Sequence, residues 1–423
     1  MALKELVELS RFYGKRKEFV IAGGGNTSFK DEAHLFIKAS GTSLAEITEE
    51  GMVKMRRDRL DAIWSRRYDR DPARREAQAL ADLMDARVEG ETKRPSVETL
   101  LHELLRHAYV VHTHPALVNG LTCARRGEKI AAELFPERMI WIPVVNPGYI
   151  LARTVKQAIE QRLTRGDYPN ILFLQNHGVF VAADSPEEIR AIYGRIMANL
   201  ESRLTARPDL TARPPDDPGL VGELSAAIAR ELAAASGAAG SGGAKGAGGA
   251  KSAGGAKGAG GAKGAGGDAA DKVAFVSNRE TARLVASRRS FAPLRSLAYT
   301  PDHIVYCGHE PAWVGRPRRS GGKGSNPLAA SFAEEMARAV AAYRKRNGHP
   351  PRVIAVEGIG LFVWGESPAK LEAASAMLLD AVGVALYSES FGGPRRMPDD
   401  KRDFIRGWEV EQYRAKINAE GAR

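Results

Sequence analysis

The chain has 423 residues, enough for two or three domains with a sizeable core. Its composition is that of a soluble globular protein. The sequence has no run of about 18 apolar residues, so it predicts no membrane span. The net charge of +11 comes from scattered basic residues without a nucleic-acid motif. We therefore expect no nucleic-acid or membrane partner. A positive net charge is equally consistent with an anionic small-molecule substrate. Two cysteines exclude a disulfide framework, and the absence of an export signal indicates a cytoplasmic location.

The first predicted elements are an amphipathic helix, MALKELVELSRFYG, and a triple-glycine loop, AGGGNTSF, at residues 22–29. Such loops present backbone N–H groups and hydroxyl groups to a phosphate, and this one contains Asn26. No Gly-Lys-Ser/Thr follows, and the spacing is not that of a dinucleotide fingerprint. The loop by itself therefore does not define a ligand.

The stretch RPSVETLLHELL, residues 94–105, predicts a helix with Ser96 as its N-cap and Glu98 in its first turn. An acidic residue in the first turn interacts favourably with the helix dipole. Taken alone, Glu98 therefore predicts a capping role.

The stretch YVVHTHPALVNG, residues 109–120, begins as an apolar, partly β-branched strand and ends near Pro115. Residues two apart on a strand point to the same face, so His112 and His114 should project into one volume. That arrangement can hold a metal ion, whereas two packed imidazoles would each need another partner. His177, in QNHGVF, is a third candidate at a strand end, where histidines are also common as structural residues.

Two breaks follow the first two hundred residues. TARPDLTARPPDDPG is rich in proline and acid, and LVGELSAAIARELAAA after it has a helical pattern. The tract from Ser236 to Asp268 is Gly/Ala with a lysine every sixth residue and no large apolar side chain, so it predicts a flexible linker. We expect a catalytic domain over residues 1–213, a helical connector over 214–235 and a disordered linker over 236–270. A C-terminal region over 271–423 should contain a degenerate repeat of the catalytic domain and a C-terminal helix.

The C-terminal region repeats part of the N-terminal one. PNILFLQNHGVFVAADSP (169–186) and PRVIAVEGIGLFVWGESP (351–368) match at a constant offset of 182, as strand, turn, strand and helix start. Convergence on one pattern is the alternative, but the gapless match favours an internal duplication. The copy has Ile359 in place of His177, and His303 and His309 are six residues apart, which gives them no simple shared face. We therefore expect a degenerate copy without a second metal site, which packs on the catalytic unit or on its copy in a homo-oligomer and helps to wall the active site.

Five motifs of the N-terminal half occur in the order found in the class II aldolases of the aldolase/adducin family, which this chain therefore resembles. They are the Gly-Asn loop, the Ser-Gly turn of KASGTSL, the Pro-Ser-x-Glu helix start, the His-x-His strand end and the later NHG. The resemblance covers about residues 1–205 and is to rhamnulose-1-phosphate and fuculose-1-phosphate aldolases. The C-terminal half resembles the rest of the aldolase portion of bacterial aldolase–dehydrogenase fusions, and no GxGxxG follows it. The implied fold is α/β: a three-layer αβα domain and a degenerate αβ copy, joined by the flexible linker.

The family pattern implies zinc, or another divalent cation, held by His112, His114 and His177. It makes Glu98 the catalytic acid/base, close to or on the metal. It places the substrate phosphate against Asn26, Ser40, Gly41 and Ser96. Phosphate-utilising members usually have a second hydroxyl residue just before the glutamate, where this chain has Val97, so the identity of the substrate stays open.

The function so implied is that of a carbon–carbon lyase, which cleaves a ketose 1-phosphate to dihydroxyacetone phosphate and an aldehyde. The resemblance also implies a homo-oligomer, because such aldolases build their sites at subunit interfaces. A pentulose-phosphate 4-epimerase of the same family, a non-catalytic adducin-like scaffold and a sugar-acid decarboxylase are the alternatives. The candidate ligands and Glu98 are all present, which argues against the scaffold.

Overall fold

The computed structural model describes residues 2–164, 166, 168–237, 272–317 and 327–408. Contacts divide the chain into two compact units. Unit 1 comprises Met1–Thr211, Phe291–Glu310 and the chain from Ala373 onward, and unit 2 comprises Ala212–Ser290 and Pro311–Glu372. The predicted linker lies outside the described residues, apart from its first two positions at the end of a helix. No described helix is both long and apolar enough to cross a membrane.

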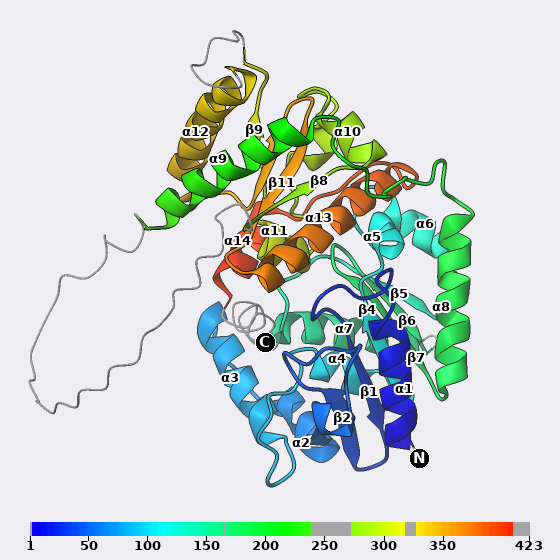
Figure 1. Cartoon of the computed structure of the whole chain (residues 1–423). Helices are drawn as coiled ribbons and strands as arrows, with labels where there is room; N and C mark the ends of the chain where they lie inside the picture. Colours follow the sequence, from blue (N-terminus) through cyan, green and yellow to red (C-terminus); the bar gives the residue numbers. More distant parts are fainter. Residues whose placement is uncertain (1, 165, 167, 238–271, 318–326, 409–423) are drawn as a thin grey trace, which may run out of the picture. The chain divides into compact units, whose positions relative to one another are not determined.

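Unit 1 is built on a seven-stranded mixed sheet in the order β3-β2-β1-β4-β7-β6-β5 (Figure 1). Its strands are β1 (Asn26–Lys30), β2 (His34–Lys38), β3 (Met52–Arg56), β4 (Tyr109–Thr113), β5 (Met139–Ile142), β6 (Ile171–Leu174) and β7 (Gly178–Ala183). All neighbouring strands are antiparallel except the parallel pair β5 and β6. Helix α7 crosses between that pair, as a parallel connection requires.

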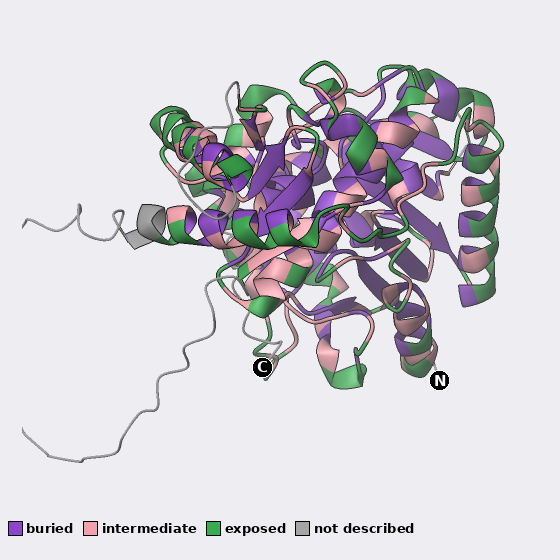
Figure 2. Ribbon diagram, turned by 45° about the horizontal axis from the view of Figure 1, so that its top comes forward, coloured by how far each residue is buried: buried purple, intermediate pink, exposed green. Residues whose placement is uncertain are grey.

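Helices cover both faces of this sheet, so unit 1 has the three αβα layers expected from the family resemblance. One face packs on α1 (Ala2–Gly14), α5 (Ala116–Thr122), α6 (Gly127–Leu134) and α8 (Pro186–Glu201). The other packs on α2 (Arg57–Ala62), α3 (Pro72–Asp85), α4 (Thr99–Leu104) and α7 (Tyr149–Leu163). Val111 belongs to the first core and Val110 to the second, as the period of two along a strand dictates. Buried residues accordingly concentrate on the strands and inner helix faces (Figure 2).

Segments from the C-terminal half complete unit 1. They are α11 (Pro301–Cys307), the later part of α13 (Pro368–Glu389) and α14 (Asp399–Gly407). Short 3-10 turns lie at Glu49–Gly51, Ile63–Ser65 and Ala292–Leu294. This grouping differs from the boundaries expected from sequence, which placed residues 291–310 and 373–423 in the C-terminal region with the repeat. The predicted boundaries stay a prediction about which parts fold independently.

Unit 2 has a four-stranded sheet in the order β8-β11-β10-β9. Its elements are α9 (Pro218–Gly237), β8 (Val273–Val276), α10 (Arg279–Val285), β9 (Ala312–Val314), α12 (Pro327–Asn347), β10 (Val353–Val356), β11 (Gly360–Trp364) and the start of α13. Its core joins the sheet to apolar residues of α9 and α12. In this sheet β8 and β11 are antiparallel, β11 and β10 are antiparallel, and β10 and β9 are parallel. The strands β4-β7-β6-β5 of unit 1 pair in the same sequence of directions.

The repeated pairing shows what the second sheet has in place of the candidate ligands. In unit 1, His112 is paired with Phe180, and in unit 2 the equivalent Phe362 is paired with Phe275. Phenylalanine therefore occupies the position of the first histidine, and Ile359 occupies that of His177. Neither side chain can bind a metal. Among the described residues, only His112, His114 and His177 form a cluster with metal-ligand geometry.

Two helical glycines of unit 1 give a matched test of its packing. A Cβ added at the buried Gly120 of α5 would overlap Cβ of Tyr387 on α13, whereas one added at the exposed Gly194 of α8 would meet nothing within 4 Å. Gly120→Ala must push the helices apart and should destabilise unit 1 by about 1–3 kcal/mol. Gly194→Ala should instead be neutral or stabilise it by up to about 1 kcal/mol, because alanine is the better helix former. Thermal unfolding midpoints measure both, and equal midpoints would contradict the described packing of α13.

Candidate active site

The register of the central strands brings the candidate residues to one edge of the first sheet. Asn26, the first residue of β1, is paired with His112 near the end of β4. His112 is in turn paired with Phe180 of β7, and its imidazole stacks on that phenyl ring with centroids 3.9 Å apart. The turn between β6 and β7 carries His177 to the same edge. The apolar strands therefore position polar side chains that belong to three separate parts of the sequence.

The three histidines converge, as the sequence pattern predicts. The Nε2 atoms of His112 and His114 lie 2.8 Å apart, and one ring nitrogen from each of the three imidazoles lies within 4.8 Å of the others. His112 Nδ1 lies 3.0 Å from the carbonyl oxygen of Val179, to which only an N–H can donate. In the neutral ring, Nε2 therefore keeps a lone pair for a metal. Burial lowers the pKa of His112 and lowers that of His177 to about 3, so both are neutral at physiological pH.

The Glu98 side chain faces these imidazoles, although Glu98 and not the predicted Ser96 occupies the N-cap position of helix α4. Helix α4 begins at Thr99, and the Glu98 side chain makes no capping hydrogen bond. Its Oε1 lies 3.4 Å from Nε2 of His112 and 3.4 Å from Nε2 of His177. Burial raises the pKa of this carboxyl, and the hydrogen bond that it accepts from the Asn26 amide lowers the pKa. The prediction that the Glu98 side chain caps the helix is therefore wrong, and the carboxylate belongs to the cluster.

Asn26 connects Glu98 to a second polar chain. Its Nδ2 donates to Glu98 Oε2 at 2.6 Å and lies 3.2 Å from Ser96 Oγ. Its Oδ1 is hydrogen-bonded to Nε2 of His102, a fully buried imidazole whose Nδ1 lies 2.7 Å from Ser28 Oγ. Burial lowers the pKa of His102 well below its usual value, so this histidine is neutral. His102 thus orients the Asn26 amide toward Glu98, a role that sequence reasoning missed although His102 lies one helical turn after Glu98.

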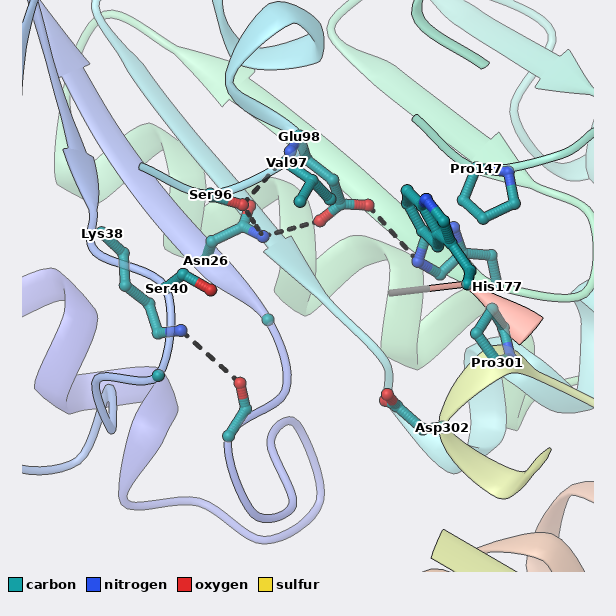
Figure 3. Close-up of a pocket in the computed structure, with 14 residues that line it drawn as sticks. Asn26, Lys38, Ser40, Ser96, Val97, Glu98, Pro147, His177, Pro301 and Asp302 are labelled. Carbon is teal, nitrogen blue, oxygen red and sulfur yellow. Dashed lines mark hydrogen bonds and ion pairs between the residues drawn. The ribbon is translucent and has the colours of Figure 1, made fainter. Parts of the chain in front are cut away.

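A pocket opens beside Glu98 and His177 (Figure 3). The four predicted phosphate-binding residues, Asn26, Ser40, Gly41 and Ser96, all line it. Other residues that line it are Gly23, Gly25, Lys38, Val97, Pro147, Pro301, Asp302 and Trp408. Lys38, at the end of β2, was not predicted, although it begins the KASGTSL motif. Its side chain is 4% exposed, and its Nζ lies 3.5 Å from the carbonyl oxygen of Gly23.

The glycine loop lies against the end of β4 for a steric reason. Gly25 has φ +67, in the left-handed region, and a Cβ there would lie 2.7 Å from the carbonyl oxygen of His112. Only glycine fits both constraints without strain. The triple-glycine motif therefore brings backbone close to the metal-ligand strand and helps to form the pocket.

Comparison with known proteins identifies the family of the N-terminal region. Residues 4–193 match the model of the class II aldolase and adducin N-terminal domain. A curated relative, the uncharacterized oxidoreductase YuxG of Bacillus subtilis (strain 168), is 22% identical over 98% of this chain, and the chain spans 58% of the length of that relative.

Solved structures with a similar fold include two class II aldolase proteins. The N-terminal class II aldolase domain of a conserved protein from Thermoplasma acidophilum is 26% identical, with a TM-score of 0.41 over 48% of this chain and 93% of that one. The L-fuculose-1-phosphate aldolase from Thermus thermophilus is 18% identical, with a TM-score of 0.31 over 47% of this chain and 91% of that one. The N-terminal region of this chain, residues 4–193, belongs to the class II aldolase/adducin family.

Proposed function

We propose that the chain is a metal-dependent carbon–carbon lyase that cleaves a ketose 1-phosphate of the rhamnulose or fuculose type to dihydroxyacetone phosphate and an aldehyde. The observation that carries the proposal is the position of the Glu98 carboxylate, 3.4 Å from two of three converging imidazoles and beside a pocket with a buried lysine. A non-catalytic scaffold needs no such cluster, and the family supplies the reaction class.

The three imidazoles fit a divalent cation such as zinc. The Nε2 atoms of His112 and His114 lie 2.8 Å apart, and the acceptors at the two Nδ1 atoms leave both Nε2 atoms available as metal ligands in the neutral rings. Neutral imidazoles at this spacing, with a carboxylate beside them, form a typical zinc donor set. His112, His114 and His177 would hold the ion, with Glu98 next to it. When bound, the cation would act as a Lewis acid on the carbonyl side of the substrate.

The chain's own groups supply the proton transfers. Breaking the bond between the carbon next to the ketone and the carbinol carbon removes the proton of the carbinol hydroxyl group and leaves an ene-diolate and an aldehyde. The Glu98 carboxylate is the group placed to take up that proton. Glu98 is the group placed to hold the proton that the ene-diolate takes up at carbon to become dihydroxyacetone phosphate. The hydrogen bond from Asn26 holds the carboxylate in position, and His102 holds Asn26 in turn.

Asn26, Ser40, Gly41 and Ser96 would bind the substrate phosphate, and Lys38 would add a positive charge. Lysine and hydroxyl groups together form charge-assisted hydrogen bonds to phosphate oxygens. Val97 lines the same pocket without a donor. The lysine is therefore the cationic group that we assign to phosphate binding.

The direct test is a cleavage screen. Rhamnulose 1-phosphate, fuculose 1-phosphate and their unphosphorylated ketoses are incubated with the purified chain and zinc, manganese or cobalt, and dihydroxyacetone phosphate is measured. We expect metal-dependent cleavage of a ketose 1-phosphate. Conversion of ribulose 5-phosphate without cleavage would instead identify a 4-epimerase, and no turnover of any substrate would contradict the proposal.

Lys38→Met removes the charge and keeps the length of the side chain. Because hydrogen bonds to charged groups contribute about 1.5–3 kcal/mol, the KM for a phosphorylated ketose should rise about tenfold or more. The KM for the unphosphorylated ketose and the metal content should stay unchanged. Kinetics on the two substrates measure the difference.

Lys54→Met is the matched control, because Lys54 lies on the neighbouring strand β3, where it is paired with Phe36 of β2 and is not among the residues that line the pocket. This variant should keep both KM values. An equal rise of KM for the phosphorylated and unphosphorylated substrates in Lys38→Met would show that Lys38 supports the pocket without binding phosphate.

A further inference from the structure

A short segment of the C-terminal half reaches the metal-ligand cluster. Residues Phe291–Glu310 group with unit 1, and helix α11 within them begins at Pro301. The second residue of that helix, Asp302, has a side chain that is 5% exposed, and its Oδ2 lies 2.6 Å from Nδ1 of His114. The two residues are 188 positions apart in the sequence. In Figure 3, Asp302 and Pro301 lie on the side of the pocket where His177 is found.

The geometry of this pair decides which nitrogen of His114 is available. A carboxylate oxygen only accepts, so Nδ1 of His114 must carry the hydrogen that it donates. In the neutral ring, Nε2 is then without hydrogen, and this is the atom 2.8 Å from Nε2 of His112. The carbonyl oxygen of Val179 fixes His112 in the same form. Each of these two imidazoles therefore has one nitrogen held by an acceptor and the other directed into the cluster.

The segment is held by contacts that do not depend on Asp302. Nδ2 of Asn176, the residue before His177, donates to the carbonyl oxygen of Tyr299 at 3.0 Å and to that of Arg395 at 2.9 Å. The N–H of Met397 donates to the carbonyl oxygen of Ala298 at 2.8 Å. Ala298 and Ile304 also belong to a small apolar core with Ile405. Asp302 is thus presented on a fixed support, and its substitution leaves that support in place.

We propose that Asp302 is a positioning residue of the metal centre, which holds His114 in the tautomer and ring orientation that directs Nε2 to the ion. The centre of the N-terminal domain is then complete only with a residue from the C-terminal half. This gives residues 291–310 a functional role that the degenerate sheet of unit 2 does not have. The inference rests on the proposed metal site.

The test uses the full-length protein with zinc or cobalt as the probe. The Kd for each metal is measured by competition with a chromophoric chelator for the wild type, Asp302→Ala and Asp302→Asn. Loss of a carboxylate that orients a metal-bound histidine typically weakens binding about 10–100-fold, which we expect for Asp302→Ala. Asp302→Asn keeps an acceptor of the same shape and should give a smaller rise in Kd.

A second readout reports the tautomer without metal or substrate. In metal-free protein labelled with ¹⁵N at histidine, long-range proton–nitrogen NMR correlations should show hydrogen on Nδ1 of His114 in the wild type. In Asp302→Ala this signature should be lost or mixed. A role limited to anchoring the segment would alter the unfolding midpoint and leave the tautomer and the Kd unchanged.

The matched control is Asp380→Asn. Asp380 Oδ2 lies 2.8 Å from Nε2 of His303, so this variant breaks a similar Asp–His pair next to Asp302 but not at a metal-ligand candidate. Its Kd should stay within about twofold of the wild type. Unchanged Kd and tautomer in folded Asp302→Asn and Asp302→Ala would overturn the inference. A wild type that binds neither metal would instead refute the proposed metal site itself.

Discussion

Replacing both His112 and His114 by alanine is expected to abolish stoichiometric metal binding and to lower turnover about a thousandfold, since the Lewis acid supplies several kcal/mol of transition-state stabilisation. The two side chains contribute the nitrogens that face each other at 2.8 Å, so their loss leaves only His177 and Glu98 at the centre. Elemental analysis after gel filtration and the rate of ketose 1-phosphate cleavage measure the two effects. The single change His177→Ala should act in the same direction.

His107→Ala serves as the control for removing a histidine near the same strand. His107 lies just before β4 and is 3.2 Å from Asp184, away from the cluster. This variant should keep the metal and the turnover. One equivalent of metal retained by the double variant would place the metal site elsewhere.

Glu98→Gln is expected to lower kcat on the order of a hundredfold or more with little change in metal content, because an amide cannot take up and return a proton. The replacement has nearly the same shape, so the pocket should still bind substrate with a similar KM. Steady-state kinetics together with metal analysis separate these effects. Unchanged kcat would exclude Glu98 as the proton carrier.

Glu103→Gln provides the comparison on the same helix. Glu103 is buried on α4, and its Oε1 lies 2.8 Å from Nε of Arg57, outside the pocket. Losing this ion pair should lower the unfolding midpoint without a hundredfold loss of kcat. Similar losses of kcat in both variants would show that helix stability, not proton transfer, explains the effect of Glu98→Gln.

Local patterns predicted most of the ligand cluster. The period of two along a strand is enough to bring His112 and His114 together, and the repeated strand–turn–strand pattern places His177 at a strand end. Glu98 was ambiguous, because an acid at a helix start fits a capping role equally well. Only its distances to Asn26 and the imidazoles decide between the two roles.

The remaining parts of the site depend on contacts between distant segments. Asp302 lies next to His303, and the spacing of His303 and His309 predicted no shared face. Nothing in the sequence around Asp302 indicates its contact with His114, 188 positions away. His102 looks like any polar residue of a short helix until its burial is known. The sequence likewise predicts one C-terminal region over residues 271–423, and contacts group residues 291–310 and 373–423 with unit 1. Which parts fold independently stays a prediction.

We expect one histidine-bound metal ion per chain to support carbon–carbon cleavage, and titration of the metal-free protein with zinc measures this stoichiometry. Zinc is added in fractions of an equivalent per chain, and the rate of dihydroxyacetone phosphate formation from a ketose 1-phosphate is followed. We predict no cleavage without metal, a linear rise, and a plateau at one equivalent. Full cleavage by the metal-free protein, or a plateau only at two equivalents, would contradict a single catalytic metal site per chain.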